Sequence, residues 1–434
     1  MTNSVWRETA AMPAFSSLQG SIRTDVLIIG GGIAGILCAH MLAQAGVEYI
    51  LVEEREICGG ITENTTAKIT SQHGMIYAKL LHRFGAERTR AYLQANEEAI
   101  DVYRKLCHGI DCDFREQSNF VYSAEEASLQ RELEALHKLN FSADLVRELQ
   151  VPVDCAGAVR FTRQAQFHPL RFLSQIAKNL NIREHTVVRE LRGCTAVTNG
   201  GRIKADRIVV ATHFPFLNKH GAYFLKLYQQ RSYVLALEQK QPTEGMYIGS
   251  QPDSLSFRSF DDLLLLGGGG HRTGKSGGGW AELEAFAKLH YPESGICYRW
   301  ATQDCMSLDG LPYIGQYSPN TPNLYVTTGF NKWGMTNAMA GAVLLRDQLL
   351  GRENPLEAVF SPSRSILHPQ LGINALESMS NLLRFSKPRC PHLGCALKWN
   401  AQEHSWDCSC HGSRFDETGR RLNNPATGDL KNKN

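Results

Sequence analysis

The chain has 434 residues, 43% of them apolar, and a formal net charge of +3. This length accommodates roughly three domains of ordinary size with real apolar cores. Because both signs of charge are spread along the chain, there is no basic face, and we expect no nucleic-acid partner. No apolar run is as long as a membrane span, and "MTNSVWRETAAMPAF" lacks the apolar segment of a signal peptide. We therefore expect no membrane span and a cytoplasmic location.

Residues 25–53 have the pattern of a strand, a tight turn, a helix and a second strand. The apolar run at 26–29 predicts a strand buried on both faces, and Gly30, Gly32 and Gly35 form GxGxxG at its end. These glycines allow a tight turn, close approach of the backbone to a pyrophosphate, and close packing of helix on strand. A glycine-rich turn that binds no ligand is the alternative.

Ile33 and Ala34 follow this turn and are also expected to bind the cofactor, because the N-terminal end of the helix faces the expected phosphate charge. Glu53 ends the second strand, about twenty residues after the turn, and is expected to accept hydrogen bonds from an adenosine ribose. Together these features predict a dinucleotide site, but they do not separate NAD from FAD.

Five later segments carry a resemblance to a known family. They are "ENTTAKIT" (63–70), "QAQFHPLRFL" (164–173), "IVVATHFP" (208–215), "LDGLPYIG" (308–315) and "NLYVTTGFNKWGMTNAMAGAVLLRDQL" (323–349). The chain over about residues 1–350 resembles the FAD-dependent amine and amino-acid oxidoreductases of the D-amino-acid oxidase type. The resemblance implies an α/β fold in which a Rossmann-like FAD-binding domain carries an inserted α+β substrate domain. It also implies further FAD-binding residues at Thr65, Thr66, Ala211, Gly315, Gly329, Gly334, Met335 and Thr336.

Residues 324–349 illustrate why this resemblance is physically reasonable. A strand at 324–328, a loop at 329–334 and a helix from Met335 onward place free N–H groups and a positive dipole end above the loop. Such a helix end stabilises the negative charge that a reduced flavin carries near N1 and O2. An ordinary βα unit without a ligand is the alternative.

His271, Arg272 and Lys68 are candidates for catalysis, with Arg231 as an alternative to Arg272. His271 and Arg272 follow a glycine-rich strand end, so His271 is a candidate base, and Arg272, or Arg231, is a candidate for holding a substrate carboxylate. Lys68 follows the turn that the resemblance places near the flavin. A solvated loop histidine and surface arginines are the simpler alternatives.

The C-terminal segment contains two cysteine–histidine pairs. Cys390 and His392 form CxH, and Cys408 and His411 form CxxH, with room for a β-hairpin between them. A [2Fe–2S] cluster with two thiolates on one iron and two imidazoles on the other needs one such pair from each of two loops. The segment therefore predicts a Rieske centre. A Cys₂His₂ zinc site or a vestigial site is the alternative.

This segment resembles the Rieske proteins of the respiratory cytochrome bc type. The resemblance implies a disulfide between Cys395 and Cys410 that ties the two cluster loops. Ser413 is retained, whereas Phe415 stands where the high-potential relatives have a tyrosine. Fewer hydrogen bonds to the cluster imply a lower reduction potential than those relatives reach.

We expect the following domains: FAD-binding at 1–90, 156–215 and 300–352; substrate-binding at 91–155 and 216–299; a linker with a helix at 353–384; and a small all-β Rieske domain at 385–434. Leu376, Met379 and Leu383 lie at helical spacing. We expect this linker helix to pack on the flavin domain, with a partner-binding helix as the alternative.

The combined prediction is an FAD-dependent oxidoreductase that removes a hydride from the C–N centre of a small amine or amino-acid-like substrate. Electrons would then pass one at a time through the Rieske cluster to an external acceptor. Two alternatives remain. One is a redox sensor or electron-transfer protein without a substrate of its own, and the other is an oxygen-using oxidase in which the cluster is structural.

Overall fold

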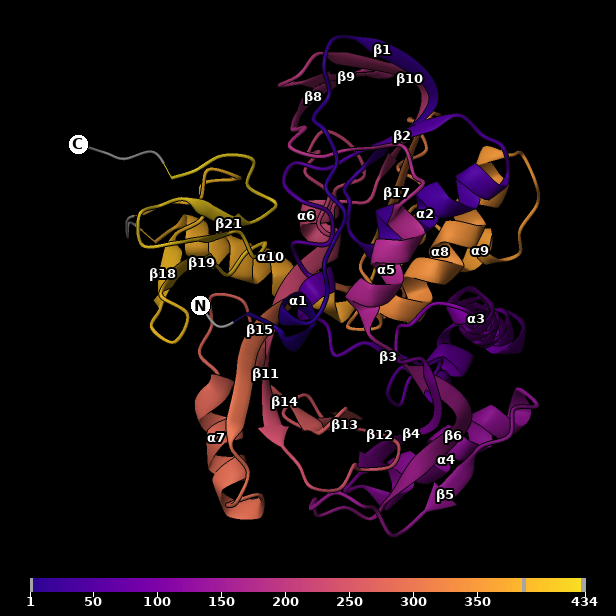
Figure 1. The fold of residues 1–434 in the computed structure, drawn as a ribbon, viewed down its shortest axis with the longest axis vertical. Coiled ribbons are helices and arrows are strands. Elements are labelled where there is room, and N and C mark those ends of the chain that lie inside the picture. Colours follow the sequence, from indigo (N-terminus) through magenta and orange to yellow (C-terminus); the bar gives the residue numbers. More distant parts are fainter. Residues whose placement is uncertain (1–2, 385–387, 431–434) are drawn as a thin grey trace.

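The computed structural model describes residues 3–384 and 388–430, which form three β-sheets with helices around the two larger ones (Figure 1). The chain crosses between the two larger sheets several times, whereas the smallest sheet is built from the C-terminal segment alone.

The first sheet is the nucleotide-type sheet, and its centre is parallel. Strand β1 pairs with β2 on one side and with β10 on the other, in parallel register. The order is β16-β17-β10-β1-β2-β7, and the β8–β9 hairpin extends β10. The strands are β1 (Ile22–Ile29), β2 (Tyr49–Val52), β7 (Ile182–Arg183), β8 (Val188–Arg192), β9 (Thr195–Thr198), β10 (Arg202–Val210), β16 (Tyr313–Gln316) and β17 (Leu324–Thr328).

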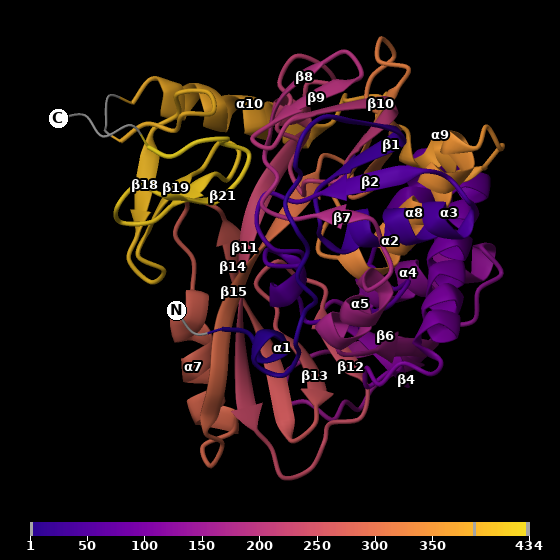
Figure 2. The ribbon, with the colours of Figure 1, turned by 45° about the horizontal axis from the view of Figure 1, so that its top comes forward.

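Two buried helices, α2 (Ile33–Gln44) and α8 (Gly334–Leu349), pack against each other beside this sheet (Figure 2). Nearly every residue of α2 is buried, so its sequence is apolar on all sides. Helices α5 (Pro169–Ala177) and α9 (Leu356–Phe360) lie on the same side, with the short helices α1 (Val5–Glu8) and η1 (Thr62–Asn64) nearby.

The second sheet has nine strands and forms the wall opposite the nucleotide turn. Its order is β15-β11-β14-β13-β12-β4-β6-β3, with β5 paired to β6. The strands are β3 (Lys68–Ile69), β4 (Arg115–Ser123), β5 (Asp144–Val146), β6 (Gly157–Gln166), β11 (Leu227–Glu238), β12 (Met246–Gly249), β13 (Ser256–Phe260), β14 (Leu263–Arg272) and β15 (Ile296–Ser307). The accompanying helices are α3 (Tyr77–Cys107), α4 (Glu126–Lys138), α6 (Tyr223–Lys226) and α7 (Gly279–His290).

This arrangement differs from the expected domain boundaries at three strands. Strands β3, β6 and β15 come wholly or largely from segments that we assigned to the FAD-binding domain, but they pair into the second sheet. The reason is that each strand pairs with strands that are distant from it in the sequence. Pairing between distant segments therefore decides the boundary, and the sequence pattern does not reveal it.

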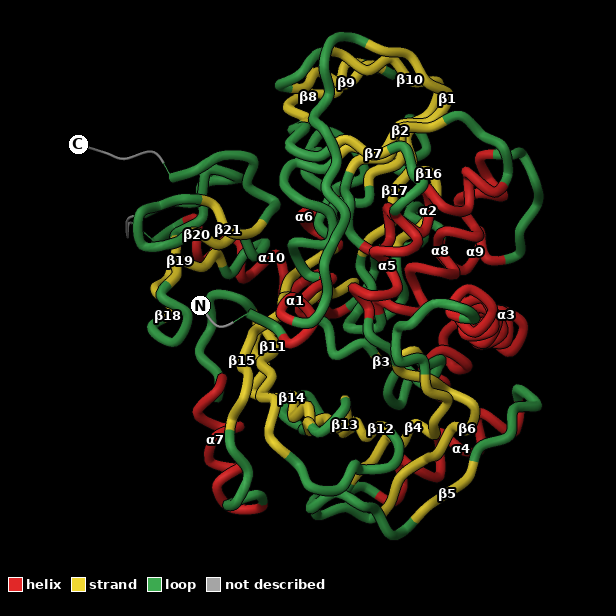
Figure 3. The backbone as a smooth tube through the Cα atoms, in the orientation of Figure 1, coloured by secondary structure: helices red, strands yellow, loops and turns green. Residues whose placement is uncertain are grey.

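The C-terminal unit is small and rich in loops (Figure 3). Its antiparallel sheet contains β18 (Leu397–Asn400), β19 (Ser405–Cys408), β20 (Arg414–Phe415) and β21 (Arg421–Asn423), in that order. Helix α10 (Pro369–Leu382) precedes it. The expectation that the apolar side of this helix packs on the flavin domain is wrong, because Leu376, Met379 and Leu383 are 68%, 59% and 72% exposed.

Over the described ranges, 3–384 and 388–430, no helix has both the length and the apolar character that crossing a membrane requires.

Candidate functional site

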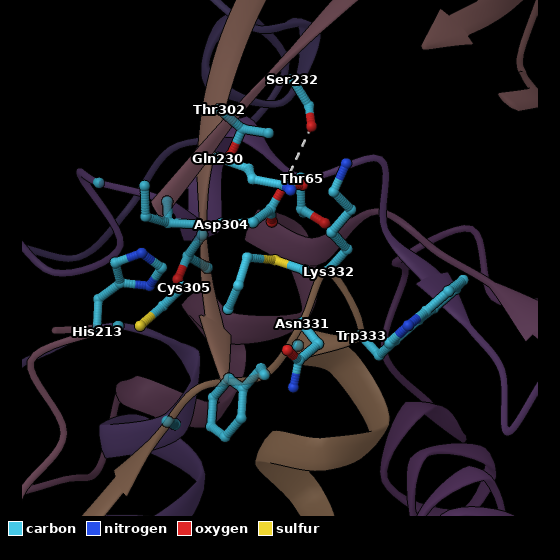
Figure 4. A pocket seen from close by; sticks show the side chains of 18 of the residues that line it. Thr65, His213, Gln230, Ser232, Thr302, Asp304, Cys305, Asn331, Lys332 and Trp333 are labelled. Carbon is cyan, nitrogen blue, oxygen red and sulfur yellow. Dashed lines mark hydrogen bonds between the residues drawn. The ribbon is translucent and has the colours of Figure 1, made fainter. Parts of the chain in front are cut away.

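A single large cavity of about 940 Å³ connects all three units of the fold. Its walls come from the strand ends of the first sheet, from one face of the second sheet and from β21 and the residues that follow it in the C-terminal unit. Figure 4 shows part of this wall, in which side chains from distant parts of the sequence point into one space.

The glycine-rich turn lies at one end of the cavity. Gly30 has a left-handed φ of 112°, and a Cβ there would come within 2.6 Å of the Ala211 carbonyl oxygen. A Cβ on Gly35 would lie 1.9 Å from the Gly30 carbonyl oxygen, so this position requires glycine for packing of α2. Gly32 is the N-cap of α2 and lines the cavity. The turn therefore has the open backbone that a pyrophosphate needs.

Glu53 lies at the end of β2, beside the same turn. Its carboxylate accepts hydrogen bonds from the N–H groups of Gly31 at 2.7 Å and Arg55 at 3.0 Å. Burial raises the pKa of Glu53, although these two hydrogen bonds oppose the shift. A carboxylate held in this way at the cavity wall is suited to accept hydrogen bonds from ribose hydroxyls.

The remaining predicted cofactor residues divide into two groups. The residues that line the cavity are Ile33, Ala34, Thr65, Thr66, Ala211, Gly334 and Met335, in addition to Gly30, Gly32 and Glu53. Gly35, Gly315, Gly329 and Thr336 lie behind the wall and do not line it. Thr336 donates a hydrogen bond to the Thr70 carbonyl at 3.0 Å, and Gly329 adopts a left-handed φ of 73° just after β17.

The N-terminal end of α8 opens into the cavity, as expected, and two rings that sequence reasoning missed lie beside it. Trp333 is the N-cap of α8 and stacks on His73, with ring centroids 5.0 Å apart and planes 17° apart. Burial lowers the pKa of His73 to about 3, so its imidazole is neutral. Each of these two rings precedes a Gly–Met pair, in "HGM" and in "WGM". This repeat is the sequence signal that could have identified His73 and Trp333.

Lys68 lines the cavity from β3. Its Nζ lies 3.5 Å from Thr66 Oγ1 and 3.4 Å from Ser256 Oγ, and no carboxylate among the described residues pairs with it. Burial, together with the positive charge of Arg258, lowers the pKa of Lys68 to about 7. A substantial fraction of this amine is therefore neutral at pH 7 and can accept a proton.

Asp304 and Lys332 face the same part of the cavity, and sequence reasoning missed both (Figure 4). Asp304 accepts a hydrogen bond from Ser232 Oγ at 3.2 Å. Burial raises its pKa, and the charge of Lys332 opposes this shift. Lys332 and the preceding Asn331 both have a left-handed φ, 73° and 52°, which is unusual outside functional sites. Such strain cannot be read from the sequence.

The structure corrects the expected position of Arg272. Its guanidinium donates hydrogen bonds to the carbonyls of Ser409 at 3.1 Å and Cys410 at 3.3 Å, and to Asn374 Oδ1 at 2.9 Å. Arg272 does not line the cavity. All three partners lie outside the second sheet, two of them in a loop of the C-terminal unit, so Arg272 holds that unit and is not positioned to hold a substrate.

Arg231 and His271 likewise lie outside the cavity lining. Arg231 forms a buried ion pair with Glu403 of the C-terminal unit, with Nε 2.9 Å from Oε1. His271 Nε2 lies 3.0 Å from the Tyr233 hydroxyl, which donates to Glu403 at 2.9 Å. These residues belong to the interface between units, because β11 and β14 continue past the cavity to the C-terminal unit.

The C-terminal unit brings the four predicted cluster ligands together. Cys390 and Cys408 are buried and hydrogen-bonded to each other, and the His392 and His411 rings are 4.9 Å apart. Nδ1 of each histidine is buried without a hydrogen-bond partner in the part of the chain that the structure describes. Two thiols and two imidazoles that converge in this way fit the mixed ligand set of a Rieske cluster.

The residues around these ligands are also in place. Cys395 and Cys410 form a disulfide. The Ser413 side chain and the N–H groups of His392 and Leu393 hydrogen-bond to the Cys390 sulfur. Phe415 is completely buried in the same small core.

The comparisons with known proteins bear on both parts of the chain. Residues 25–348 match the family described as "DAO: FAD dependent oxidoreductase". The chain belongs to this family of FAD-dependent oxidoreductases. Residues 375–433 match the description "Rieske [2Fe-2S] domain". The DAO domain binds FAD and the Rieske domain binds a [2Fe–2S] cluster, so the predicted fold class and cofactors are confirmed.

Three similar proteins span most of the chain. The Rieske 2Fe-2S iron-sulfur protein YhfW of Bacillus subtilis (strain 168) is 35% identical over 98% of this chain and 96% of its own length. Glycine oxidase from Geobacillus kaustophilus has a TM-score of 0.67 at 19% identity, over 79% of this chain and 99% of its own. L-proline dehydrogenase from P. horikoshii has a TM-score of 0.67 at 18% identity, over 80% and 98%. The two solved structures show the fold alone.

The Rieske domain docks on the DAO domain through its ligand loops. Gln229 Nε2 donates to the His411 carbonyl at 2.8 Å, and Gln303 Nε2 donates to the Gly412 carbonyl at 2.9 Å. His392 Nε2 lies 2.9 Å from Asn218 Oδ1. The histidine side of the cluster site therefore faces the DAO domain.

Proposed function

We propose that this protein oxidises the C–N bond of a small amine or amino-acid-like substrate and passes the electrons through its Rieske centre to an external acceptor. FAD supplies the chemistry that such a reaction needs, since it accepts a hydride and can release electrons singly. The observation that carries the proposal is the docking of the cluster-ligand loop at 408–413 against the wall of the FAD cavity.

A short polar path supports the exchange of electrons within the chain. His213 lines the cavity and hydrogen-bonds to the side chain of Gln229. Gln229 in turn donates to the carbonyl of His411, a predicted ligand. Burial lowers the pKa of His213 to about 4, so the path is uncharged at neutral pH. An electron moving along it does not have to cross a fixed charge.

The substrate class is supported by the charges at the cavity wall. Asp304 can bind the ammonium group of a substrate, and Lys332, which faces the same part of the cavity, can bind a carboxylate. Two structural neighbours, glycine oxidase and L-proline dehydrogenase, are named after amino-acid substrates. We propose an amino acid or a closely related amine.

Lys68 is the proposed proton acceptor. Hydride removal from carbon beside nitrogen requires a neutral amine, so the substrate ammonium must first lose a proton. With a pKa of about 7, Lys68 is poised to accept that proton without a strong preference for either state. Thr66 and Ser256 hold its Nζ at the wall through their hydroxyl groups.

The test is anaerobic rapid mixing of the intact protein with a panel of amines and amino acids. The flavin absorbance should bleach first, and the EPR signal of a reduced Rieske cluster should then appear at a rate independent of protein concentration. A Cys408→Ser variant, which loses the cluster, should still bleach its flavin. Cys107→Ser is the matched control, since Cys107 is also a buried cysteine but lies in α3, outside both the cluster site and the cavity lining.

The rival functions give different results. A sensor or electron-transfer protein would show no bleaching with any substrate, and an oxidase with a structural cluster would form peroxide equally well in the Cys408→Ser variant. A cluster that stays oxidised beside a fully reduced flavin would also refute the proposed order. The cytoplasmic location remains a prediction from the sequence.

A further inference from the structure

Helix α10 presents an apolar surface to solvent immediately before the Rieske loops. Its exposed large side chains are 46–72% accessible, and one more lies in the first cluster loop at 40%. We call this surface the α10 patch; it consists of Ile373, Leu376, Met379, Leu382, Leu383 and Leu393.

The orientation of the helix is fixed by its polar side. Asn374 is 2% exposed, accepts a hydrogen bond from Arg272 and donates one to the Leu225 carbonyl at 3.3 Å. Asn381 is 1% exposed, and its backbone carbonyl accepts the Ala396 N–H at 3.1 Å. Because polar residues hold the buried side, the apolar side cannot turn inward without breaking these hydrogen bonds.

The α10 patch is continuous with the cluster site. Arg389 donates to the carbonyls of Leu382 at 3.4 Å and Gly394 at 2.7 Å, and so joins the end of the helix to the first cluster loop. Leu393 in that loop directly follows the predicted ligand His392. A molecule on the patch would therefore lie next to the cluster, on the side that the DAO domain leaves open.

The charges beside the patch are predominantly positive. Lys275 and Arg384 lie close to Lys398. Burial lowers the pKa of Lys398, and the positive charges of Lys275 and Arg384 lower it further. Glu377 is the one acidic residue of α10, and its carboxylate is paired with Lys275 at 2.6 Å. An apolar centre with a positive rim complements a partner that has an apolar centre and a negative rim.

We propose that the α10 patch is the docking surface for the external electron acceptor, and that this acceptor is a small redox protein with an acidic surface around its own cofactor. This inference rests on the proposed function, in which the cluster passes electrons out of the protein. The continuity with Leu393 favours an electron carrier over a lipid surface, because contact at that point shortens the distance to the cluster. In the transfer step one electron leaves the reduced cluster, and an oxidised metal centre of the partner gains it.

The experiment uses the holoprotein with its cluster reduced by dithionite, so that no substrate turnover is needed. Excess reductant is removed, and the protein is mixed anaerobically with an acidic c-type cytochrome or with basic mitochondrial cytochrome c. Haem iron(III) is then reduced to iron(II) by the cluster. We expect the acidic cytochrome to react at least tenfold faster at low salt and to lose this advantage as the ionic strength rises.

Two variants test the surface itself. Leu383→Glu removes an apolar contact and adds a negative charge, and Arg384→Glu reverses a charge of the rim. Each should slow reduction of the acidic cytochrome about tenfold or more, with unchanged FAD content and cluster EPR spectrum. Leu289→Glu is the matched control, since Leu289 is 73% exposed on α7, compared with 72% for Leu383. The control should react like the unchanged protein.

Three results would overturn the proposal. The first is equal rates for both patch variants and the control. The second is binding of the unchanged protein, but not of Leu383→Glu, to vesicles of phosphatidylglycerol, which would assign the patch to a lipid surface. The third is a dimer in analytical ultracentrifugation that Leu383→Glu converts to a monomer, which would assign it to a second copy. Failure of substrate oxidation alone would affect the proposed function and leave these measurements intact.

Discussion

Replacement of Glu403 by glutamine should loosen the Rieske domain from the DAO domain. Glu403 lies in the loop between β18 and β19, and its side chain is 8% exposed. It pairs with Arg231 of the DAO domain and with Arg414 of its own domain, the latter at 2.8 Å. The glutamine would fill nearly the same volume but would leave two buried guanidinium groups without this counter-charge.

The size of the effect follows from the pKa of Glu403. Burial raises this pKa, but Arg231 and Arg414 outweigh burial and lower it from 4.5 to about 2. A difference of about two and a half pKa units corresponds to about 3 kcal/mol. This agrees with the ~3–5 kcal/mol typical of breaking a buried ion pair from one side. Because the pKa of Glu403 is lower in the folded state, its contribution to the free energy of unfolding is complete above about pH 4.5. This contribution is lost as the pH falls toward 2.

Urea unfolding can measure this loss if each domain is followed by its own signal. Visible circular dichroism reports the cluster and flavin fluorescence reports the DAO domain, which avoids treating the whole chain as two-state. With a slope of ~1–2 kcal/mol per molar urea, the midpoint of the cluster signal should fall by roughly 1.5–3 M. The control is Glu417→Gln, since Glu417 pairs with His404 but is 61% exposed. Equal midpoints for the two variants would refute the reasoning.

Four further substitutions test individual parts of the site. Gly32→Val should abolish FAD binding, because its side chain would enter the space of the pyrophosphate at the N-cap of α2; retained flavin absorbance would contradict this. Phe415→Tyr should raise the cluster potential and Ser413→Ala should lower it, each by about 40 mV for about 1 kcal/mol of hydrogen bond, in an EPR-monitored titration. Lys68→Met should lower kcat/KM by roughly 10²–10⁴-fold and remove the rise of kcat/KM as the pH increases through about 7; an unchanged pH profile would exclude Lys68 as the base.

The sequence was most informative where chemistry depends on residues that are close along the chain. The turn at Gly30, Gly32 and Gly35 and the pairs around Cys390 and Cys408 each have local spacing that only a few functions require. The comparisons confirm both cofactors. In each case a short segment carries the whole signal.

The sequence was least informative where a side chain is given its role by a distant segment. Arg272 was assigned to the substrate because it follows a glycine-rich strand, but its partners Ser409 and Cys410 lie more than a hundred residues away. Asp304 was missed because nothing in its strand indicates that it faces a cavity. The apolar spacing in α10 correctly predicts a helix, but the side that is buried carries the polar residues Asn374 and Asn381.

The contacts between the domains bear on how electrons could move. Several kinds of contact oppose movement of the Rieske domain relative to the DAO domain. The ion pair of Glu403 is buried, Gln229 and Gln303 hold the carbonyls of a ligand loop, and Arg421 pairs with Glu54 beside the nucleotide turn at 2.7 Å. Separating the domains would expose all of these groups at once, at a cost of several kcal/mol. In the proposed reaction the cluster therefore stays at the cavity wall, and only the last electron transfer, out of the protein, depends on diffusion.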